Sequence, residues 1–313
     1  MKVFGPVPSR RLGQSLGVNN IPPKTCSYSC VYCQIGRTNR LQITRRPFYE
    51  PRDLLAEIES RLNALRKANK QVDFITFVPD GEPTLDQNLG TEIRLLKQFG
   101  IKIAVITNAS LIWMDEVKDD LMAADWVSLK VDAVDRELWR KIDRPHGNLD
   151  LGKIHAGIKE FARQFRGTLV TETMLVKGRN DTGENLGQVG AFLNLVQPAA
   201  AYLLTPTRPP AERGVEPVEK ETLRASGLAL SEIAGAPVKC IAAEDEANFF
   251  AADDVIGDLL STMSVHPLRE DILKAMLCEK KYGEETIQRM IDQDLIKEIV
   301  YESKKFYVRN LEK

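Results

Sequence analysis

Three of the chain's five cysteines, Cys26, Cys30 and Cys33, lie within eight positions of one another in the stretch CSYSCVYC. Three thiolates from one short loop can hold three corners of a cubane iron–sulfur cluster, with one iron for each cysteine. A zinc site is the competing interpretation. Zinc normally takes paired cysteines together with a second pair or histidines, and the three histidines of the chain are all remote in sequence.

A fourth cysteine ligand is not evident. Cys240 lies in an apolar strand pattern and Cys278 at the end of a helical pattern. Either is able in principle to approach the loop, but we expect both to be small buried apolar residues. One iron would then be open to a small molecule.

Polar residues follow several of the predicted strands. Asp80, Gly81 and Glu82 stand in FVPDGEPTLD, at the end of the second predicted strand, where they could contribute to a site. The alternative interpretation is a purely structural tight turn between two prolines. Ser128, Lys130 and Asp132 alternate in SLKVDA and therefore point to one face, unless the last two merely occupy an exposed strand end. Two further pairs are expected to line the same cavity: Thr107 with Asn108, and Thr171 with Thr173.

The elements that must position these residues alternate along the chain. Short β-branched runs at 15–19, 73–78, 102–107, 126–131, 168–176 and 200–205 predict six strands, and amphipathic segments at 51–68, 89–99, 116–124, 151–165 and 183–196 predict the helices between them. Strands joined in this way lie parallel, and their carboxyl ends form the active site. Periodicity alone does not decide between an open sheet and a barrel. A further helix (218–235) and a short strand (237–243) follow a proline-rich loop.

From about Asp253 the pattern changes to three short helices followed by two alternating strands around a turn at Glu302, Ser303 and Lys304. This is the order of a winged helix, so we predict a barrel domain over 1–250 and a winged-helix-like domain over 251–313. Lysine and arginine balance aspartate and glutamate over 266–313, and the would-be recognition helix EETIQRMIDQD is acidic. We therefore expect docking to the barrel or to a protein in preference to DNA, with Lys304 and Lys305 as the only basic candidates.

The whole chain has a formal net charge of −1 and a sequence pI near 6.4, which argues against a broadly basic nucleic-acid-binding surface. Neither a membrane span nor a secretory segment is evident, so we expect a soluble cytoplasmic protein with no membrane partner. Its cysteines should act as thiols and metal ligands rather than as disulfides.

With Tyr32 before its last cysteine and a predicted strand before its first, CSYSCVYC resembles the signature of the radical S-adenosylmethionine (radical SAM) superfamily. The resemblance covers roughly residues 1–245. It implies an α/β fold, a partial (β/α)6 barrel, and a 4Fe–4S cluster on Cys26, Cys30 and Cys33 whose open iron binds S-adenosylmethionine. A flavodoxin- or ferredoxin-type donor would reduce the cluster, and cleavage of the cofactor would yield a 5′-deoxyadenosyl radical that abstracts hydrogen from a substrate.

The resemblance also assigns roles to the strand ends. DGE is similar to the family's GGE motif, which contacts the amino group of the cofactor, with Asp80 in place of the first glycine. Lys130 and Asp132 are the candidate catalytic residues. The expected cofactor-binding residues are Tyr32, Gly81, Glu82, Thr107, Asn108, Ser128, Lys130, Asp132 and Thr173.

Within the superfamily, FGPVPSRRLG, CVYCQ, DGEPTL, TNAS and SLKVDA most resemble the wyosine tRNA-modifying synthase group. Those enzymes bind a second cluster through upstream cysteines, and this chain has none before Cys26, so the resemblance implies a single-cluster relative. We expect a nucleotide or tRNA substrate, with Arg10 and Arg11 or Arg208 as candidate anion contacts or simply as surface cations. Two alternatives stay open: a protein- or peptide-modifying enzyme such as a glycyl-radical activase, and a cluster-bearing regulator that uses the winged helix.

Overall fold

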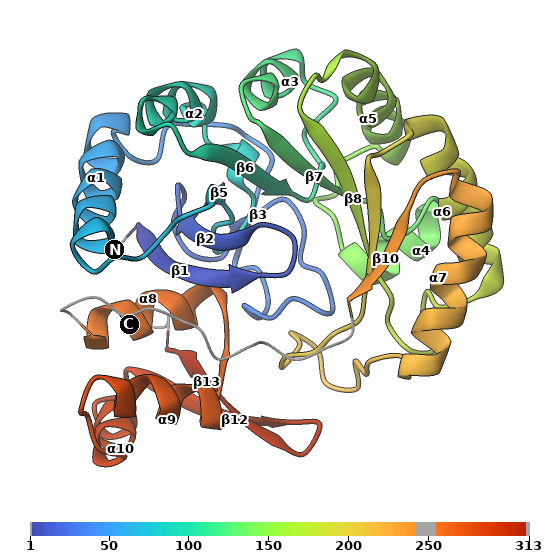
Figure 1. Ribbon diagram of the computed structural model, residues 1–313. Helices are drawn as coiled ribbons and strands as arrows, with labels where there is room; N and C mark the ends of the chain where they lie inside the picture. Colours follow the sequence, from blue (N-terminus) through green and yellow to red (C-terminus); the bar gives the residue numbers. More distant parts are fainter. Residues whose placement is uncertain (1, 242–254, 311–313) are drawn as a thin grey trace.

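The computed structural model describes residues 2–241 and 255–310. Its main feature is an eight-stranded sheet that curves without closing, so the predicted α/β partial barrel is confirmed (Figure 1). The strands follow one another in the sheet in the order β1 (Val3–Ser9), β2 (Gly13–Val18), β5 (Phe74–Phe77), β6 (Lys102–Thr107), β7 (Trp126–Lys130), β8 (Thr168–Met174), β9 (Ala200–Leu204) and β10 (Val238–Ile241). Neighbours from β2 to β10 are parallel, whereas β1 pairs with β2 antiparallel.

Helices cover the convex face of the sheet (Figure 1). Each presents an apolar stripe to it, as α1 does with Leu54, Ile58, Leu62 and Leu65 at helical spacing. Asp150 and Thr182 cap α5 and α6 by accepting hydrogen bonds from backbone amides of the first turn. The helices of this layer are α1 (Pro51–Lys67), α2 (Leu89–Leu96), α3 (Asp115–Met122), α5 (Leu151–Gln164), α6 (Gly183–Val196) and α7 (Lys220–Ala234).

Three elements near the carboxyl ends of the strands were not predicted. Helix α4 (Arg136–Asp143) lies between β7 and α5. Two short strands, β3 (Thr25–Cys26) and β4 (Arg40–Leu41), pair with each other, and β3 contains the first cysteine of the motif. Strand β1 was also missed, since its two prolines disguise an edge strand. The barrel also contains two 3-10 turns, η1 (Pro83–Leu85) after β5 and η2 (Lys97–Phe99) after α2.

The two faces of the sheet differ in what they bury. On the concave face, here called the interior face, Lys130 lies beside Glu172 in the strand register. On the helix-covered face Leu129 lies beside Thr171, and Leu203 beside Thr173. The expectation that Thr171 and Thr173 line the cavity is therefore wrong, because side chains alternate between the faces and these two share the face of the helix-packed core.

Residues 255–310, here called the C-terminal unit, have a core of their own. The predicted three helices and hairpin are confirmed, and the winged helix itself stays a prediction. The unit comprises α8 (Val255–Val265), β11 (Leu268–Arg269), α9 (Glu270–Glu279), α10 (Glu285–Asp292), β12 (Ile296–Tyr301) and β13 (Lys304–Arg309), with sheet order β11-β13-β12. The predicted boundary at residue 250 lies outside the described residues.

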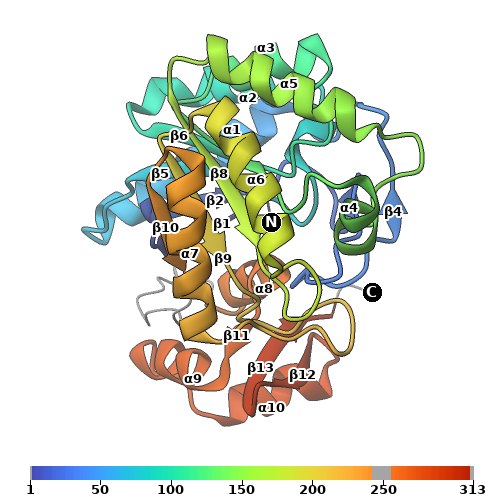
Figure 2. The ribbon, with the colours of Figure 1, turned by 90° about the vertical axis from the view of Figure 1, so that its right-hand side faces the viewer.

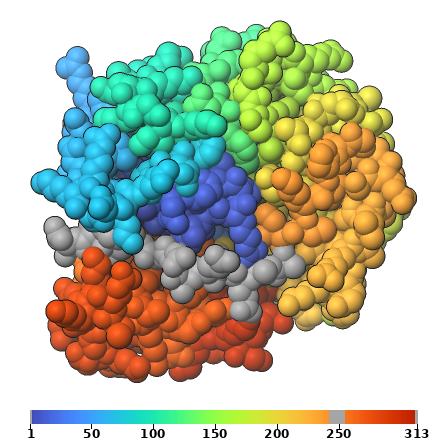
Figure 3. Space-filling model, viewed as in Figure 1, coloured from blue at the N-terminus to red at the C-terminus, as the bar shows by residue number. Residues whose placement is uncertain are grey.

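The C-terminal unit lies against the barrel (Figures 2 and 3). Arg61 of α1 donates to Asp258 of α8 at 2.8 Å, and the side chain of Gln34 donates to the carbonyl of Val265 at 2.6 Å. The expected docking to the barrel is thus present, through contacts that reach the residue following Cys33. No helix in the described part of the chain is long and apolar enough to cross a membrane.

Candidate functional site

The loop that carries the three cysteines is shaped by the unpredicted helix α4. The backbone amide of Val31 donates to the carbonyl of Ile142 at 2.9 Å, and that of Ser29 to the carbonyl of Asp143 at 3.0 Å. Trp139 packs edge-on against Tyr28, with ring centroids 5.9 Å apart, and donates its indole N–H to the tyrosine hydroxyl. These contacts with α4 hold the loop in place.

The three cysteines of this loop form no disulfide and are half-buried. Burial raises the pKa of Cys26 to about 12, with Glu82 acting in the same direction. Burial also raises the pKa of Cys30, together with Asp143, which accepts its S–H at 3.3 Å. For Cys33, burial raises the pKa while nearby Lys130 opposes the shift. Such thiols release their protons when a metal supplies the compensating charge.

The donor set fits a cluster better than a single ion. No three His, Cys, Asp or Glu side chains within residues 2–241 and 255–310 converge closely enough to hold one metal ion. A cubane cluster offers each thiolate a separate iron, so its cysteines need not converge on one point.

The turn after β5 depends on a glycine. A Cβ at Gly81 would lie 1.8 Å from the carbonyl oxygen of Thr25, which is a prohibitive overlap. The backbone amide of Glu82 donates to that same oxygen at 3.1 Å. Gly81 therefore lets the DGE turn lie directly against the strand that leads into Cys26.

Glu82 is almost fully buried and accepts four hydrogen bonds. Its carboxylate receives the amide and hydroxyl of Thr84, the hydroxyl of Thr107 at 2.5 Å and the amide of Asn108 at 2.7 Å. Burial raises the pKa of Glu82, and these hydrogen bonds oppose the shift. Thr107 and Asn108 therefore serve first to hold Glu82.

Asn108 also reaches the cysteines. Its side-chain amide lies 3.5 Å from the sulfur of Cys26 and donates to the hydroxyl of Ser27 at 2.9 Å. One residue thus ties the carboxylate of the DGE turn to a candidate cluster ligand.

One carboxylate oxygen of Asp80 is available to accept a hydrogen bond. It is 1% exposed, and Asn19 donates to one of its oxygens at 3.0 Å. Its other oxygen, Oδ1, is buried with no hydrogen-bond partner among the described residues. Burial raises the pKa of Asp80 to about 6. Because a buried orphan acceptor is costly, this atom suits a donor group on a ligand.

Glu172 is a site residue that sequence reasoning missed. It is buried on the interior face, where Arg11 pairs with it, Ser128 donates to it at 2.8 Å and the Lys130 ammonium lies 3.8 Å away. Burial would raise its pKa, but Arg11 and Lys130 bring the pKa below its usual value. A charged glutamate within an otherwise apolar strand pattern was the signal that could have identified it. The sequence-based prediction chose the threonines on either side instead.

A second group of acids lies beside Cys30. The Tyr32 hydroxyl hydrogen-bonds to Asp132 and lies 3.2 Å from Asp143, while Asp132 also accepts the amide of Met174 at 2.7 Å. Burial and neighbouring Asp132 raise the pKa of Asp143 well above its usual range. Asp132 is 2% exposed, so the alternative of an exposed strand end is wrong for it.

Several candidates lie elsewhere. The hydroxyl of Thr173 donates to the carbonyl of Val131 on the helix-covered face, so it is not a cavity residue. Cys240 and Cys278 are exposed, which corrects the expectation that both are buried. Arg10 is exposed, and Arg208 hydrogen-bonds to Gln34 and His266. Arg208 therefore joins the cysteine loop to the C-terminal unit.

Comparison with known proteins gives consistent results. The family model described as "Radical SAM superfamily" matches residues 20–186. A UPF0026 protein of Methanocaldococcus jannaschii is 42% identical over 309 residues, covering 98% of this chain and 96% of the relative. A probable GTP 3′,8-cyclase of Pyrococcus horikoshii is 26% identical over 179 residues, covering 56% and 53%.

Solved structures share the fold at low identity. A radical SAM methyltransferase from Sphaerobacter thermophilus superposes with a TM-score of 0.57 at 17% identity, covering 74% of this chain and 67% of the other. A structure of TYW1 with a lysine-pyruvate adduct bound gives a TM-score of 0.55 at 15% identity, covering 70% and 73%.

Proposed function

The chain belongs to the radical SAM superfamily, and we propose from this premise that Cys26, Cys30 and Cys33 hold a 4Fe–4S cluster beside a bound S-adenosylmethionine. A reduced cluster held by these cysteines would supply the one electron needed to cleave S-adenosylmethionine into methionine and a 5′-deoxyadenosyl radical, and that radical would take hydrogen from a substrate. The observation that carries the proposal is the link through Asn108 between Glu82 and Cys26. It joins the two motifs of which a cofactor-binding site of this kind is made.

The protein's own groups have distinct tasks in this scheme. Glu82 and the unpaired oxygen of Asp80 are the acceptors available for the cofactor's amino group. Lys130 can hold an anionic group at the interior face, because Asp132 and Glu172 keep its pKa raised against the effect of burial. The Tyr32–Asp132 hydrogen bond fixes the aromatic ring over which the Lys130 ammonium lies, 5.4 Å from its centroid.

We propose a nucleotide, free or within tRNA, as the substrate class. Support comes from the Pyrococcus relative, which is described as a probable GTP 3′,8-cyclase. Arg11 and Lys130 bring two cations to the interior face, where Glu172 and Asp132 hold them in place. A flavodoxin- or ferredoxin-type protein would deliver the electron.

The test is an anaerobic assay. The cluster is reconstituted, S-adenosylmethionine and dithionite are added, and 5′-deoxyadenosine is measured with nothing further, with nucleoside triphosphates, with bulk tRNA and with a protein extract. We expect formation in all cases and a rise with nucleotide or tRNA. A rise only with protein would move the substrate class to proteins, and no 5′-deoxyadenosine despite bound iron would refute the proposal. Cys240→Ser is the matched control for a Cys30→Ser variant.

A further inference from the structure

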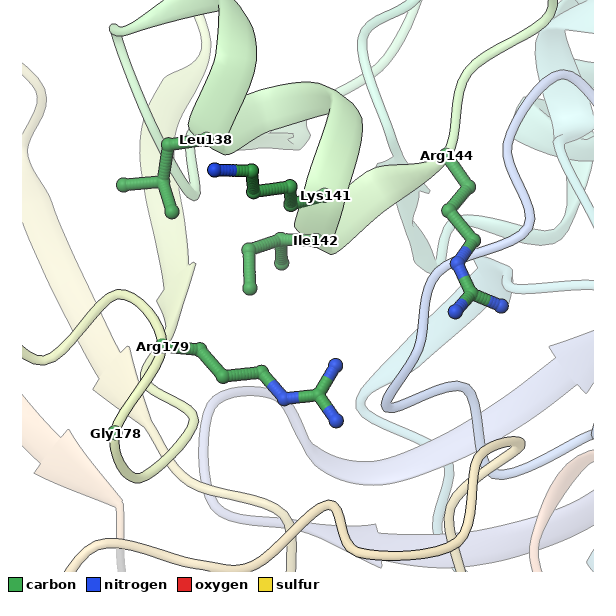
Figure 4. Close-up of a pocket in the computed structure, with 6 residues that line it drawn as sticks. All are labelled: Leu138, Lys141, Ile142, Arg144, Gly178 and Arg179. Atoms are coloured by element: carbon green, nitrogen blue, oxygen red, sulfur yellow. The ribbon is translucent and has the colours of Figure 1, made fainter.

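A cavity of about 590 Å³ lies behind the cysteine loop, between α4 and the loop that follows β8 (Figure 4). Its lining residues are Leu138, Lys141, Ile142, Arg144, Gly178 and Arg179. Half of them are cationic, and none is acidic. A volume of this size accommodates a small molecule or one unit of a larger one.

The two elements bring their cations to the opening from different directions. In Figure 4, α4 presents Lys141 and its end carries Arg144, while Arg179 reaches across from the β8–α6 loop. No carboxylate within the described ranges forms an ion pair with Lys141 or Arg179. These two charges therefore remain available to a ligand.

Arg144 is held in place at some conformational cost. It ends α4 in the left-handed region, with φ 45° and ψ 61°, which is disfavoured for a residue with a side chain. Its guanidinium donates to Glu212 at 2.6 Å, and Glu212 also accepts from Arg37 at 2.7 Å. One carboxylate thus positions Arg144 at the cavity while it is shared with Arg37.

The cavity adjoins the candidate active site through its wall. Ile142 packs in a small apolar cluster with Val31, which lies between Cys30 and Cys33 in the loop. The carbonyl of Ile142 accepts the amide of Val31, and the next residue, Asp143, lies 3.3 Å from the sulfur of Cys30. A group bound in this cavity would lie at the back of the cysteine loop.

We infer that this cavity is a phosphate-binding subsite for the substrate. Several guanidinium and ammonium groups around one opening suit a polyanion, because arginine pairs with phosphate oxygens two at a time. The partly exposed Leu138 adds an apolar contact that fits the uncharged part of a nucleotide. The inference rests on the proposed function, which it narrows to phosphorylated substrates. The phosphate belongs either to a free nucleotide or to an RNA backbone.

The test measures binding rather than turnover. Titration calorimetry with inorganic triphosphate and with bulk tRNA compares the wild-type chain with Lys141→Gln/Arg179→Gln. The matched control is Arg52→Gln/Lys67→Gln, which removes the same charge from exposed positions on α1. We expect the cavity variant to bind triphosphate roughly tenfold or more weakly, and the control to stay near wild type. Iron content and the thermal unfolding midpoint verify that each variant folds.

The two phosphate sources give different results. If RNA is the source, tRNA competes with triphosphate and the cavity variant lowers the salt dependence of tRNA binding by one to two ions, at roughly 0.7 to 0.9 per contact. If a free nucleotide is the source, triphosphate binds and tRNA does not compete. Equal weakening in cavity and control variants, or no triphosphate binding by the wild type, overturns the inference. The 5′-deoxyadenosine assay without added substrate scores the proposed function separately.

Discussion

The barrel and the C-terminal unit bury polar groups in different ways. Around the carboxyl ends of the strands the barrel encloses carboxylates such as Glu82, Asp132 and Glu172, each almost out of contact with water. Among the described residues of the C-terminal unit, the buried polar side chains are hydroxyls together with one acid, Asp258. That acid pairs with Arg61 of the barrel.

This difference separates two tasks. Burying a carboxylate costs several kcal/mol unless partners compensate, so a fold retains such groups where they bind something. In the barrel Glu82 lies near Cys26, and Asp132 and Asp143 lie near Cys30, while Oδ1 of Asp80 has no hydrogen-bond partner among the described residues. In the C-terminal unit the single buried acid is used for docking. We therefore expect the barrel to carry the chemistry, with the C-terminal unit docked to it through the Arg61–Asp258 pair.

The largest expected effect compares cysteines of the two regions. Cys30→Ser in the barrel should abolish 5′-deoxyadenosine formation, because two remaining thiolates do not retain a cubane cluster. Cys278→Ser in α9 should leave both iron content and formation unchanged, since Cys278 is exposed and outside the loop. Iron analysis and product chromatography provide the measurement. Comparable losses of iron and of 5′-deoxyadenosine formation in both variants would contradict the assignment of the chemistry to the barrel alone.

The next effect concerns the contact between them. Asp258→Ala leaves the side chain of Arg61, only 10% exposed, without this carboxylate, at a cost on the order of 3 kcal/mol. We expect α8 to gain hydrogen exchange and protease sensitivity while the barrel strands keep their protection. Lys305→Gln, which removes an exposed pair with Glu298 in the same unit, should change stability by less than about 1 kcal/mol. Unchanged exchange of α8 in Asp258→Ala would show that apolar packing alone holds the unit.

The fold was largely predictable because its signals are local. Buried parallel strands appear as short β-branched runs, and the helices between them carry apolar residues at helical spacing. Helix α4 was missed although Asp135, whose side chain accepts the amide of Leu138, is a recognisable N-cap. Strand β1 escaped because proline is atypical of strands away from an edge.

The site was predictable where one motif contains the whole signal. The cysteine spacing and the DGE turn are of this kind, and the overlap at Gly81 gives the turn its physical reason. Arg11 and Glu172 are 161 positions apart, and their pairing depends on which face each strand turns inward. A shift of one residue in that assignment exchanges Glu172 for Thr173, and this is the error that sequence reasoning made.

The smallest expected effect compares two acids whose pKa values are shifted in opposite directions. Burial, reinforced by Asp86, raises the pKa of Glu92 in the barrel to about 9, whereas a hydrogen bond from Arg269 lowers the pKa of Asp271 in the C-terminal unit. A raised pKa means that the folded state keeps a proton that the unfolded state has lost. The contribution of Glu92 is thus complete below about pH 4.5 and is lost as the pH rises toward 9.

Glu92→Gln should remove that dependence, because glutamine keeps the shape of the protonated acid and does not ionise. In urea unfolding, we expect the variant's stability relative to wild type to increase by roughly 1 kcal/mol per pH unit between pH 6 and 8. Asp271→Asn should act in the opposite sense and only in acid, since its contribution is present above the usual pKa of an aspartate and is lost below it. A Glu92→Gln profile parallel to wild type would mean that Glu92 is ionised in the folded barrel. The barrel would then bury a charged group that binds no ligand. Burial of a carboxylate would therefore no longer be sufficient to identify the functional site.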